Sequence, residues 1–410
     1  MFKRNLVQKI KESLEDTPVL FISGARQTGK STLIKSLVSS AYSAEYITFD
    51  ESSMLSAAKT DPEGFIKRLP KPVALDEVQR VPELFLAIKA DVDRVRTHGR
   101  YILTGSANVL LLPKIADSLA GRMEILTLWT LSQNELHESG ETFVDKIFSG
   151  NPLPTRYTSL HRSDIMEMLV KGGYPEVLSR KNEERRRTWF GSYITTILQR
   201  DVRDLARIEG LTVLPRLLSL LAARTSTLFN LAEVSNSSNI PQTSLKRYLS
   251  LLETTYLITY LPAWASNLGK RLIKTPKLLL CDTGIAAHLI GVSASELAQQ
   301  SHAFGQLLES FVTMELTKQI TWSETDAELF HFRTLRSQEV DLVLEDRSHR
   351  VVGIEVKAGA TVTASDFKNI RIFAEIAGEK FHLGIVLYTG TEVIPFGENL
   401  FAVPVNALWL

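Results

Sequence analysis

The sequence contains a single cysteine, Cys281. An internal disulfide framework and a zinc site built from several cysteines are therefore excluded, and such cysteine usage fits a reducing cytosol. No apolar run approaches the roughly 18 to 20 residues that cross a bilayer, and the charged segment 1–16 has no apolar core of a signal peptide. We therefore expect a cytoplasmic protein without membrane contact.

The sequence also has almost no net charge, because 47 lysines and arginines nearly cancel 46 aspartates and glutamates. The overall balance therefore indicates no polyanionic partner, although a basic face on one segment is compatible with it. The chain of 410 residues is too long for one ordinary hydrophobic core, so we expect about two to four domains.

A complete phosphate-loop pattern, G-x-x-x-x-G-K-S, follows an apolar run and precedes a helix-like segment. Gly24 and Gly29 allow backbone angles that side chains forbid, so that backbone N–H groups can surround a triphosphate at a helix N-terminus. Lys30 would neutralise the β and γ phosphates, and the hydroxyl of Ser31 would bind Mg²⁺. The residues expected to bind ATP are Gly24, Ala25, Arg26, Gln27, Thr28, Gly29, Lys30, Ser31 and Thr32.

A second landmark is an apolar strand, 72–75, that ends in two carboxylates. Asp76 is expected to hold the Mg²⁺ ion, usually through water, and Glu77 to orient and polarise the attacking water. Paired acids favour hydrolysis over binding alone, although acids are also common at solvated strand ends. The neighbouring strand, 101–104, ends in polar groups, where Thr104 or Ser106 either senses the γ phosphate or simply caps a helix.

The transition state of phosphoryl transfer carries charge that a cation can stabilise. Arg122, on the loop before the last expected strand, is a candidate for this catalytic role, and Arg26 competes with it. Each is equally compatible with a surface ion pair. A role for Arg122 across a subunit interface would require a homo-oligomer.

Strands alternate with helices up to residue 129, including an expected helix at 107–119. This alternation predicts a mostly parallel sheet with helices on both faces and a ligand at the carboxyl ends of its strands. Helix-like segments follow up to residue 205, broken by Gly172-Gly173-Tyr174-Pro175. The arginines in this part indicate phosphate contacts, a subunit contact or a solvated face; they are Arg185, Arg186, Arg187, Arg200, Arg203 and Arg207.

Residues 211–262 predict helices at 213–223, 230–237 and 241–254, followed by a strand at 256–261. This order is the outline of a winged helix whose third helix would present polar and basic side chains to a major groove. These side chains are Gln242, Thr243, Ser244, Lys246 and Arg247. The same outline is also typical of a packing or oligomerisation module, so DNA contact is one of two interpretations. Farther along, Asp282 is expected to cap a helix that begins near Gly284.

The C-terminal part carries a second candidate chemistry. Alternation along the strand 351–356 places Glu355 and Lys357 on one face, where Asp341 of the adjoining hairpin strand can meet them. Glu309, in a helix at 303–320, could complete a metal shell. Two carboxylates suited to Mg²⁺ and a lysine that positions water form an arrangement for phosphodiester hydrolysis. Individually these residues are ordinary at strand edges, so a metal site and a purely structural role stay open.

Several segments resemble those of bacterial and archaeal ATP-binding proteins that join an AAA-type ATPase domain to a C-terminal domain of unknown function. The similarity covers nearly the whole chain, although Cys281 stands where the family more often has valine or another aliphatic residue. The resemblance implies a restriction-endonuclease-like fold for the C-terminal part, with Asp341, Glu355 and Lys357 on its D, E and K positions. The segments are 24–31, Leu75-Asp76-Glu77-Val78-Gln79, Leu103-Thr104-Gly105-Ser106, Leu119-Ala120-Gly121-Arg122, 172–175 and Cys281-Asp282-Thr283-Gly284.

These observations predict an α/β protein with four parts: an AAA-type P-loop ATPase domain (1–135), a helical linker or lid (136–208), a winged-helix-like module (209–265) and a restriction-endonuclease-like domain (266–410). The predicted function is an Mg²⁺-dependent ATPase that acts as a switch or motor coupled to the C-terminal half. DNA is the expected partner, through residues 241–254 and the C-terminal domain. The alternative is a signalling or scaffold ATPase that binds proteins and keeps a catalytically inactive nuclease-like fold.

Overall fold

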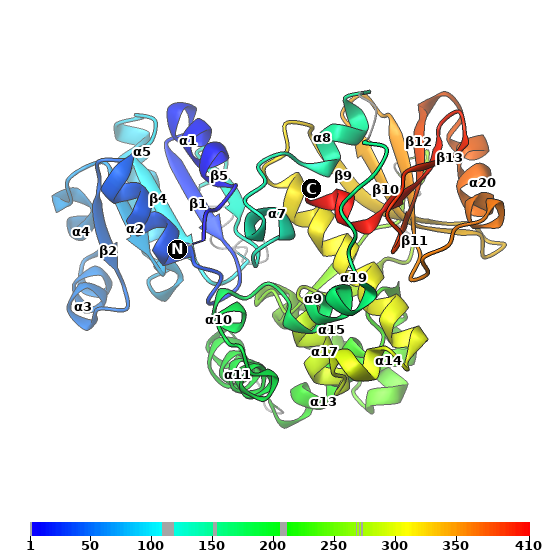
Figure 1. Ribbon diagram of the computed structural model, residues 1–410. Helices are drawn as coiled ribbons and strands as arrows, with labels where there is room; N and C mark the ends of the chain where they lie inside the picture. The colour runs from blue at the N-terminus through cyan, green and yellow to red at the C-terminus, as the bar shows by residue number, and fades with distance from the viewer. Residues whose placement is uncertain are drawn as a thin grey trace. The chain divides into compact units, whose positions relative to one another are not determined.

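The computed structural model describes residues 2–108, 119–150, 154–205, 211–267, 269, 271 and 274–410 (Figure 1). Most of the helix expected at 107–119, and Arg207, lie outside these residues. The chain divides into two compact units. Unit 1 comprises Met1–Leu131 and Ser250–Leu257, and unit 2 comprises Ser132–Leu249 and Ile258–Leu410. The finer division into four parts stays a prediction.

Unit 1 contains a five-stranded sheet in the order β2-β3-β4-β1-β5. All neighbouring strands are parallel, so their carboxyl ends lie at the same edge. The strands are β1 (Val19–Ser23), β2 (Glu45–Thr48), β3 (Val73–Asp76), β4 (Tyr101–Gly105) and β5 (Met123–Thr127). The helical segments are α1 (Val7–Asp16), α2 (Lys30–Ser40), α3 (Ser52–Thr60), α4 (Pro62–Arg68), η1 (Val78–Arg80) and α5 (Leu84–Arg94).

Different helices cover the two faces of this sheet. Val19 and Phe21 of β1 belong to a buried cluster that includes residues of α3, α4 and α5. Leu20 and Ile22, which alternate with them, belong to a second cluster with residues of α1 and α2. Since successive side chains of a strand point to opposite faces, helices cover the sheet on both sides, and this prediction is confirmed.

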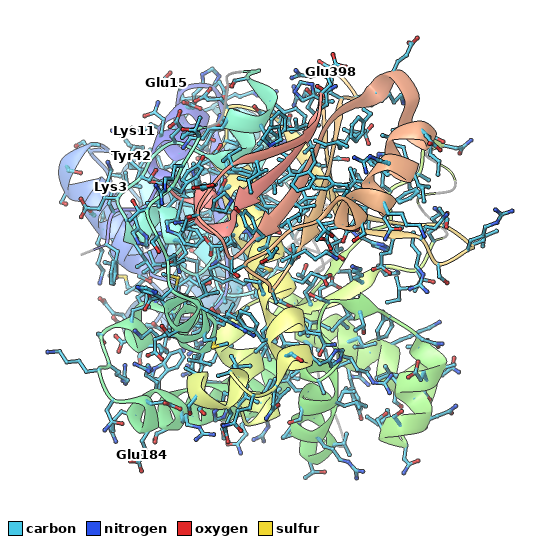
Figure 2. All side chains as sticks on the ribbon, turned by 45° about the vertical axis from the view of Figure 1, so that its right-hand side comes forward. Lys3, Lys11, Glu15, Tyr42, Glu184 and Glu398 are labelled. Carbon is cyan, nitrogen blue, oxygen red and sulfur yellow. The ribbon has the colours of Figure 1, made fainter. Side chains whose placement is uncertain are left out.

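The N-terminal helix α1 is amphipathic. Its Ile10 is fully buried against the sheet. Lys11 and Glu15 are exposed, and Figure 2 shows both side chains on the outer surface of the helix. Apolar residues at helical spacing on one face are the pattern that predicts such a helix from the sequence.

Unit 2 begins with a mainly helical part. Its segments are α7 (Gln133–Leu136), α8 (Phe143–Phe148), α9 (Arg162–Lys171), α10 (Pro175–Leu178), α11 (Glu183–Thr196), η3 (Ile197–Asp201) and α12 (Val202–Leu205). Of the arginine run on α11, only Arg185 and Arg187 are exposed, because Arg186 is buried and pairs with Glu167 at 2.7 Å. The run is therefore not a uniform solvated face.

A small module with a three-stranded antiparallel sheet, in the order β6-β8-β7, follows in unit 2. In chain order its elements are η4 (Leu211–Val213), α13 (Leu214–Ala222), β6 (Thr227–Leu228), α14 (Leu231–Ser238), α15 (Gln242–Thr254), β7 (Ile258–Leu261) and β8 (Lys277–Leu280). Residues 250–254 of α15 belong to unit 1. The strand expected from Tyr256 begins only at Ile258, because Tyr256 has a positive φ of 59° and the chain turns there.

The C-terminal part of unit 2 is a mixed six-stranded sheet in the order β13-β14-β12-β11-β10-β9. Its strands are β9 (Ala327–Arg333), β10 (Glu339–Asp346), β11 (Val351–Val356), β12 (Phe381–Tyr388), β13 (Ile394–Gly397) and β14 (Leu400–Pro404). The accompanying helical segments are α17 (Thr283–Ile290), α18 (Ala294–Leu297), α19 (Ser301–Ile320), η5 (Ala364–Phe367), α20 (Lys368–Ala377), η6 (Gly378–Lys380) and η7 (Val405–Leu408). The predicted α/β architecture with a C-terminal sheet domain is confirmed.

One buried aspartate joins two sequence motifs that lie far apart in the chain. Asp282 caps α17 by accepting hydrogen bonds from the N–H groups of Gly284 and Ile285, at 3.0 and 3.2 Å. Its other oxygen accepts from Gly173 N at 2.8 Å. A Cβ at Gly172 would lie 2.1 Å from the same carboxylate, so the glycine permits this close approach. The predicted cap is confirmed, and the break at 172–175 packs against it.

Among the described residues, no helix is both long and apolar enough to span a bilayer.

Candidate functional site

The phosphate loop connects β1 to α2 at the carboxyl edge of the parallel sheet. Gly24 and Gly29 have φ values of 151° and 96°, and Gln27 between them is also left-handed. A Cβ at Gly24 would lie 2.2 Å from the carbonyl oxygen of Leu128, so no other residue fits there without displacing the backbone. Because α2 begins at Lys30, the unpaired N–H groups of its first turn face the loop. This geometry is suited to binding an anion.

Lys30 is buried, and its side chain bonds back to the backbone of the loop. Its Nζ donates hydrogen bonds to the carbonyl oxygens of Gly24 and Ala25, at 2.9 and 2.8 Å. Phosphate oxygens offer the ammonium group stronger partners than these neutral carbonyls. The residues present therefore fit the phosphates of a nucleoside triphosphate in the loop.

Arg4 also supports the loop, although no sequence motif predicts this role. Its guanidinium donates to the carbonyl oxygens of Thr28 and Trp129, both at 2.7 Å. An isolated arginine near the N-terminus belongs to no recognisable motif. Only the fold places it against residues 24 and 125 positions away.

Asp76, at the end of β3, is almost fully buried and accepts hydrogen bonds from several hydroxyl groups. Ser31 Oγ donates to its Oδ1 at 3.1 Å, and Tyr46 donates to its Oδ2 at 2.6 Å. The hydroxyl of Thr104 also bonds to Asp76. The structure thus brings Ser31, Asp76 and Thr104 together beside the loop. A hydroxyl and a carboxylate in this arrangement are suitable ligands for Mg²⁺.

Tyr46 is another residue that the sequence did not reveal. Burial, and then the neighbouring Asp76, raise the pKa of its phenol. The group therefore stays protonated and keeps its role as a hydrogen-bond donor to the carboxylate. A tyrosine in a short strand has no signature that separates this role from ordinary packing.

Glu77 follows Asp76 with a φ of 59°, which turns its side chain away from the strand direction. Its carboxylate accepts a hydrogen bond from Gln79 Nε2, and Ser106 Oγ lies 3.4 Å from the same oxygen. Its backbone N–H donates to Thr104 Oγ1 at 3.2 Å. Polar groups from the ends of β3 and β4 thus hold Glu77, including Gln79, which the sequence did not reveal as a site residue.

Arg122 does not come to this site within the chain. It precedes β5, and its carbonyl oxygen accepts from Val19 N at the amino end of β1. The phosphate loop follows the opposite end of β1, about 16 Å away for a strand of five residues. The guanidinium instead forms an ion pair with Asp93. Arg26 remains in the loop and is half-buried.

The root of the loop contacts the segment 250–257, which belongs to the same unit. The hydroxyl groups of Ser23 and Tyr256 are hydrogen-bonded to each other. The ring of Tyr256 packs edge-on against Trp129, with centroids 5.5 Å apart. Asn108 N donates to the carbonyl oxygen of Thr254 at 2.8 Å. The residue directly before Gly24 is therefore bonded to the segment that continues α15.

The second predicted site lies in unit 2, where α19 packs against the six-stranded sheet (Figure 1). Asp341 Oδ2 accepts from Val356 N at 2.9 Å, which fixes the carboxylate between β10 and β11. Lys357 Nζ lies 3.6 Å from Glu355 Oε2. The other oxygen of Glu355 is buried without a hydrogen-bond partner. Asp341, Glu355 and Lys357 are thus close neighbours.

A buried lysine that the sequence did not reveal occupies the centre of this cluster. The Nζ of Lys277 lies 2.8 Å from Glu309 Oε1, 2.7 Å from Glu339 Oε1 and 3.9 Å from Asp341 Oδ1. Its side chain is 2% exposed. In the sequence, Lys277 appears only as the end of a basic segment before an apolar strand. We call Lys277, Lys357 and the surrounding carboxylates of Glu309, Glu339, Asp341 and Glu355 the acid–lysine cluster.

Burial and mutual charge perturb the acids of this cluster. Burial, and then the charge of Asp341, raise the pKa of Glu355 to about 9. Burial and Asp341 also raise the pKa of Glu309 to about 8, although Lys277 opposes this shift. For Lys277, burial lowers the pKa, but Glu309, Asp341 and Glu339 outweigh it and raise the pKa above its ordinary value. Lys277 is therefore charged at neutral pH.

These residues do not fit the divalent metal that a nuclease-like site would need. Within the described part of the chain, no group of three or more acidic, histidine or cysteine side chains is arranged to hold a metal ion. The ammonium group of Lys277 stands among the carboxylates that would have to ligate one. Two of the three predicted metal ligands, Glu309 and Asp341, therefore already face a protein cation.

Three family models match successive parts of the chain. An AAA domain matches residues 16–137. A domain of unknown function (DUF8612) matches residues 162–296, and another (DUF4143) matches residues 304–408. The first match covers the phosphate loop and Asp76, and the last covers most of the acid–lysine cluster.

Two proteins that are similar to this chain over nearly its whole length are themselves called uncharacterized. Proteins of Mycobacterium tuberculosis and Mycobacterium bovis are 29% identical over 409 residues, which is 99% of this chain and 84% of theirs. Among solved structures, the RuvB Holliday junction branch migration motor of Thermotoga maritima is 16% identical, with a TM-score of 0.30, and the match covers 64% of this chain and 90% of RuvB. AMPPCP-bound DnaA from Aquifex aeolicus is 15% identical, with a TM-score of 0.30 and coverage of 61% and 87%. At such scores the likeness carries no inference about function.

Proposed function

We propose that this protein, which joins an N-terminal AAA domain to a C-terminal domain of unknown function, binds Mg²⁺-ATP in unit 1 and hydrolyses it. The observation that carries the proposal is that Ser31 of the phosphate loop donates a hydrogen bond to Asp76, the residue that ends β3 and directly precedes Glu77. An anion-binding loop alone would support binding. The acids beside it support hydrolysis.

The residues have separate roles in this proposal. The bound metal and nucleotide supply an electrophilic phosphorus whose charge is partly neutralised. Lys30 exchanges its bonds to loop carbonyls for bonds to phosphate oxygens. Ser31 and Asp76 would hold the cation, and Thr104 and Tyr46 orient Asp76. Glu77 accepts the proton of the attacking water when its carboxylate is free of Gln79.

Steady-state hydrolysis by wild type, Lys30→Ala and Glu77→Gln tests this assignment. We expect Glu77→Gln to bind ATP normally and to lose about 10²- to 10⁴-fold in kcat, as for the loss of a general base. Lys30→Ala should lose binding as well. Lys59→Ala and Glu83→Gln, which change exposed residues of the same unit, are matched controls. Turnover in Glu77→Gln equal to that of its control would disprove hydrolysis by this site.

We further propose that ATP turnover acts as a switch on the helix α15. In support, Ser23 at the root of the loop bonds to Tyr256, just beyond the end of α15. A rearrangement of the loop around a nucleotide would thus reach this helix through one hydrogen bond and the Trp129 contact. Tyr256→Phe removes the bond and keeps the ring. We expect this variant to hydrolyse ATP at the basal rate but to lose any effect of a bound partner on that rate.

The partner that the chain supports best is duplex DNA. The order α13, β6, α14, α15, β7, β8, with an antiparallel sheet, agrees with a winged helix whose third helix is α15. Gln242, Thr243, Lys246 and Arg247 are exposed on this helix, whereas Leu245 and Leu249 are buried. Its outer face is therefore polar and basic, as a groove-binding helix requires.

Fluorescence anisotropy with a labelled DNA duplex tests this partner. Lys246→Ala/Arg247→Ala should weaken binding about tenfold or more and reduce the salt dependence by roughly one to two phosphate contacts. Lys3→Ala/Lys11→Ala, which removes the same charge from the exposed residues labelled in Figure 2, is the matched control. Equal loss in both variants would indicate nonspecific attraction, and no loss in either would favour the alternative of a scaffold ATPase that binds proteins.

A further inference from the structure

The acid–lysine cluster draws charged groups from every element packed around it. Helix α19 contributes Glu309, β10 contributes Glu339 and Asp341, and β11 contributes Glu355, followed by Lys357. Opposite them, β8 contributes Lys277, and β9 contributes Arg333, which lies 3.2 Å from the second oxygen of Glu339. His331 of β9 is buried, with its Nε2 directed to the carbonyl oxygen of Thr275.

We infer that the ammonium group of Lys277 takes the place of a divalent cation in the acid–lysine cluster, so that this cluster is not a metal-dependent hydrolytic site while β8 holds its position. The inference goes beyond the ATPase proposal and does not depend on it. It assigns a structural cation, supplied by the chain itself, to carboxylates that include two of the predicted metal ligands, Glu309 and Asp341.

The distances support this exchange of one cation for another. Lys277 Nζ already makes short contacts with Glu309 and Glu339 and lies within 4 Å of Asp341. A metal ligated by Asp341 and Glu309, whose side chains are each 18% exposed, would have to stand within a few ångströms of this ammonium. Two cations at that separation repel each other, and the more so because Lys277 itself is 2% exposed. Metal and lysine therefore exclude each other.

Lys277 is also firmly held in place. It is the first residue of β8, the central strand of the β6-β8-β7 sheet, and pairs with Leu261 of β7 and Leu228 of β6. The three leucines after it are buried. The strand thus fixes the backbone of Lys277, and the ammonium could leave the carboxylates only by a change of rotamer in a side chain that is 2% exposed. One oxygen of Glu355 is buried without a hydrogen-bond partner. This oxygen could ligate an incoming metal ion if Lys277 were absent.

Titration with Mn²⁺ in the absence of nucleotide, followed by electron paramagnetic resonance of the free ion, tests the inference. Wild type and Asp341→Asn should give the same curve. Lys277→Met should gain one site at least tenfold tighter than any in wild type, and Lys277→Met/Asp341→Asn should lose it again. Lys318→Met is the matched control, since Lys318 is another buried lysine that pairs with a glutamate, Glu315, at 2.8 Å. It should gain no site.

Two results would overturn the inference. One is a Mn²⁺ site in wild type that Asp341→Asn removes, which needs no lysine variant and so stands even if Lys277→Met does not fold. The other is a folded Lys277→Met protein without a new site, because the ammonium would then not be what keeps the metal out. If Lys277→Met folds with a lowered melting temperature, Mn²⁺ should raise that temperature and leave that of Lys318→Met unchanged; no rise counts against the inference.

Discussion

Asp282 provides a quantitative test of how unit 2 is held together. Its carboxylate accepts two hydrogen bonds from the first turn of α17 and one from Gly173. Loss of a helix cap costs about 1 kcal/mol. Leaving the buried N–H of Gly173 without a partner costs about 1 to 3 kcal/mol. Asp282→Ala should therefore lower the free energy of unfolding of unit 2 by about 2 to 4 kcal/mol.

Asp282→Asn should cost less than the alanine variant. The asparagine has one carbonyl oxygen, so it can serve either the cap or Gly173, and its NH₂ group then faces the other donors. Against this loss, burial raises the pKa of Asp282, which means that the folded protein carries a cost for keeping the carboxylate charged. Asparagine removes that cost. We expect a loss of about 1 to 3 kcal/mol.

Urea unfolding monitored by circular dichroism measures both variants against Asn230→Ala. Asn230 caps α14 with two similar hydrogen bonds, at 3.1 and 3.2 Å, but is exposed and makes no link to a distant loop. The difference between Asp282→Ala and Asn230→Ala therefore isolates the bond to Gly173. If the two variants lose the same stability, the proposed joint between residues 172–175 and α17 contributes nothing.

Two further predictions concern unit 1. Burial raises the pKa of Asp91, but hydrogen bonds from Arg100 and its neighbours outweigh this and lower it from 3.8 to about 2. Above pH 4, Asp91 should thus contribute roughly 2 kcal/mol to the free energy of unfolding, and this contribution is lost as the pH falls toward 2. The difference in stability between wild type and Asp91→Asn should therefore shrink over that range. A difference that is independent of pH would contradict this prediction. Tyr46→Phe removes a hydrogen bond to Asp76 and should raise the Mg²⁺ concentration for half-maximal ATPase activity about tenfold. Tyr42→Phe, whose hydroxyl bonds to a carbonyl oxygen away from Asp76, should leave it unchanged.

The strands of the parallel sheet in unit 1 were predictable because each is encoded locally, whereas their order in the sheet was not predicted. Apolar runs such as 72–75 identify buried strands, and the glycine positions of the phosphate loop have backbone requirements that few other patterns share. Residues that contact each other within a turn or a loop form a local sequence pattern that can be recognised.

The supporting residues were not predictable, because their partners are distant in the chain. Arg4 bonds to Thr28 and Trp129, and Lys277 meets acids 32 and more positions away. A lysine before an apolar strand is typical of the end of a solvated connector. No neighbouring residue in the sequence indicates that Lys277 is buried. Arg122 lies near the expected last strand, but at the end of the sheet opposite to the loop of its own chain, so a role across a subunit interface stays a prediction.

Equilibrium binding of ATP to the nucleotide-site variants tests the central claim most directly. Isothermal titration with ATP and Mg²⁺ should give one site per chain in wild type, an unchanged site in Lys59→Ala, and an affinity reduced at least tenfold in Lys30→Ala. Folded wild-type protein without measurable heat of binding, or Lys30→Ala protein that binds as tightly as wild type, would show that the loop between β1 and α2 does not hold a nucleotide.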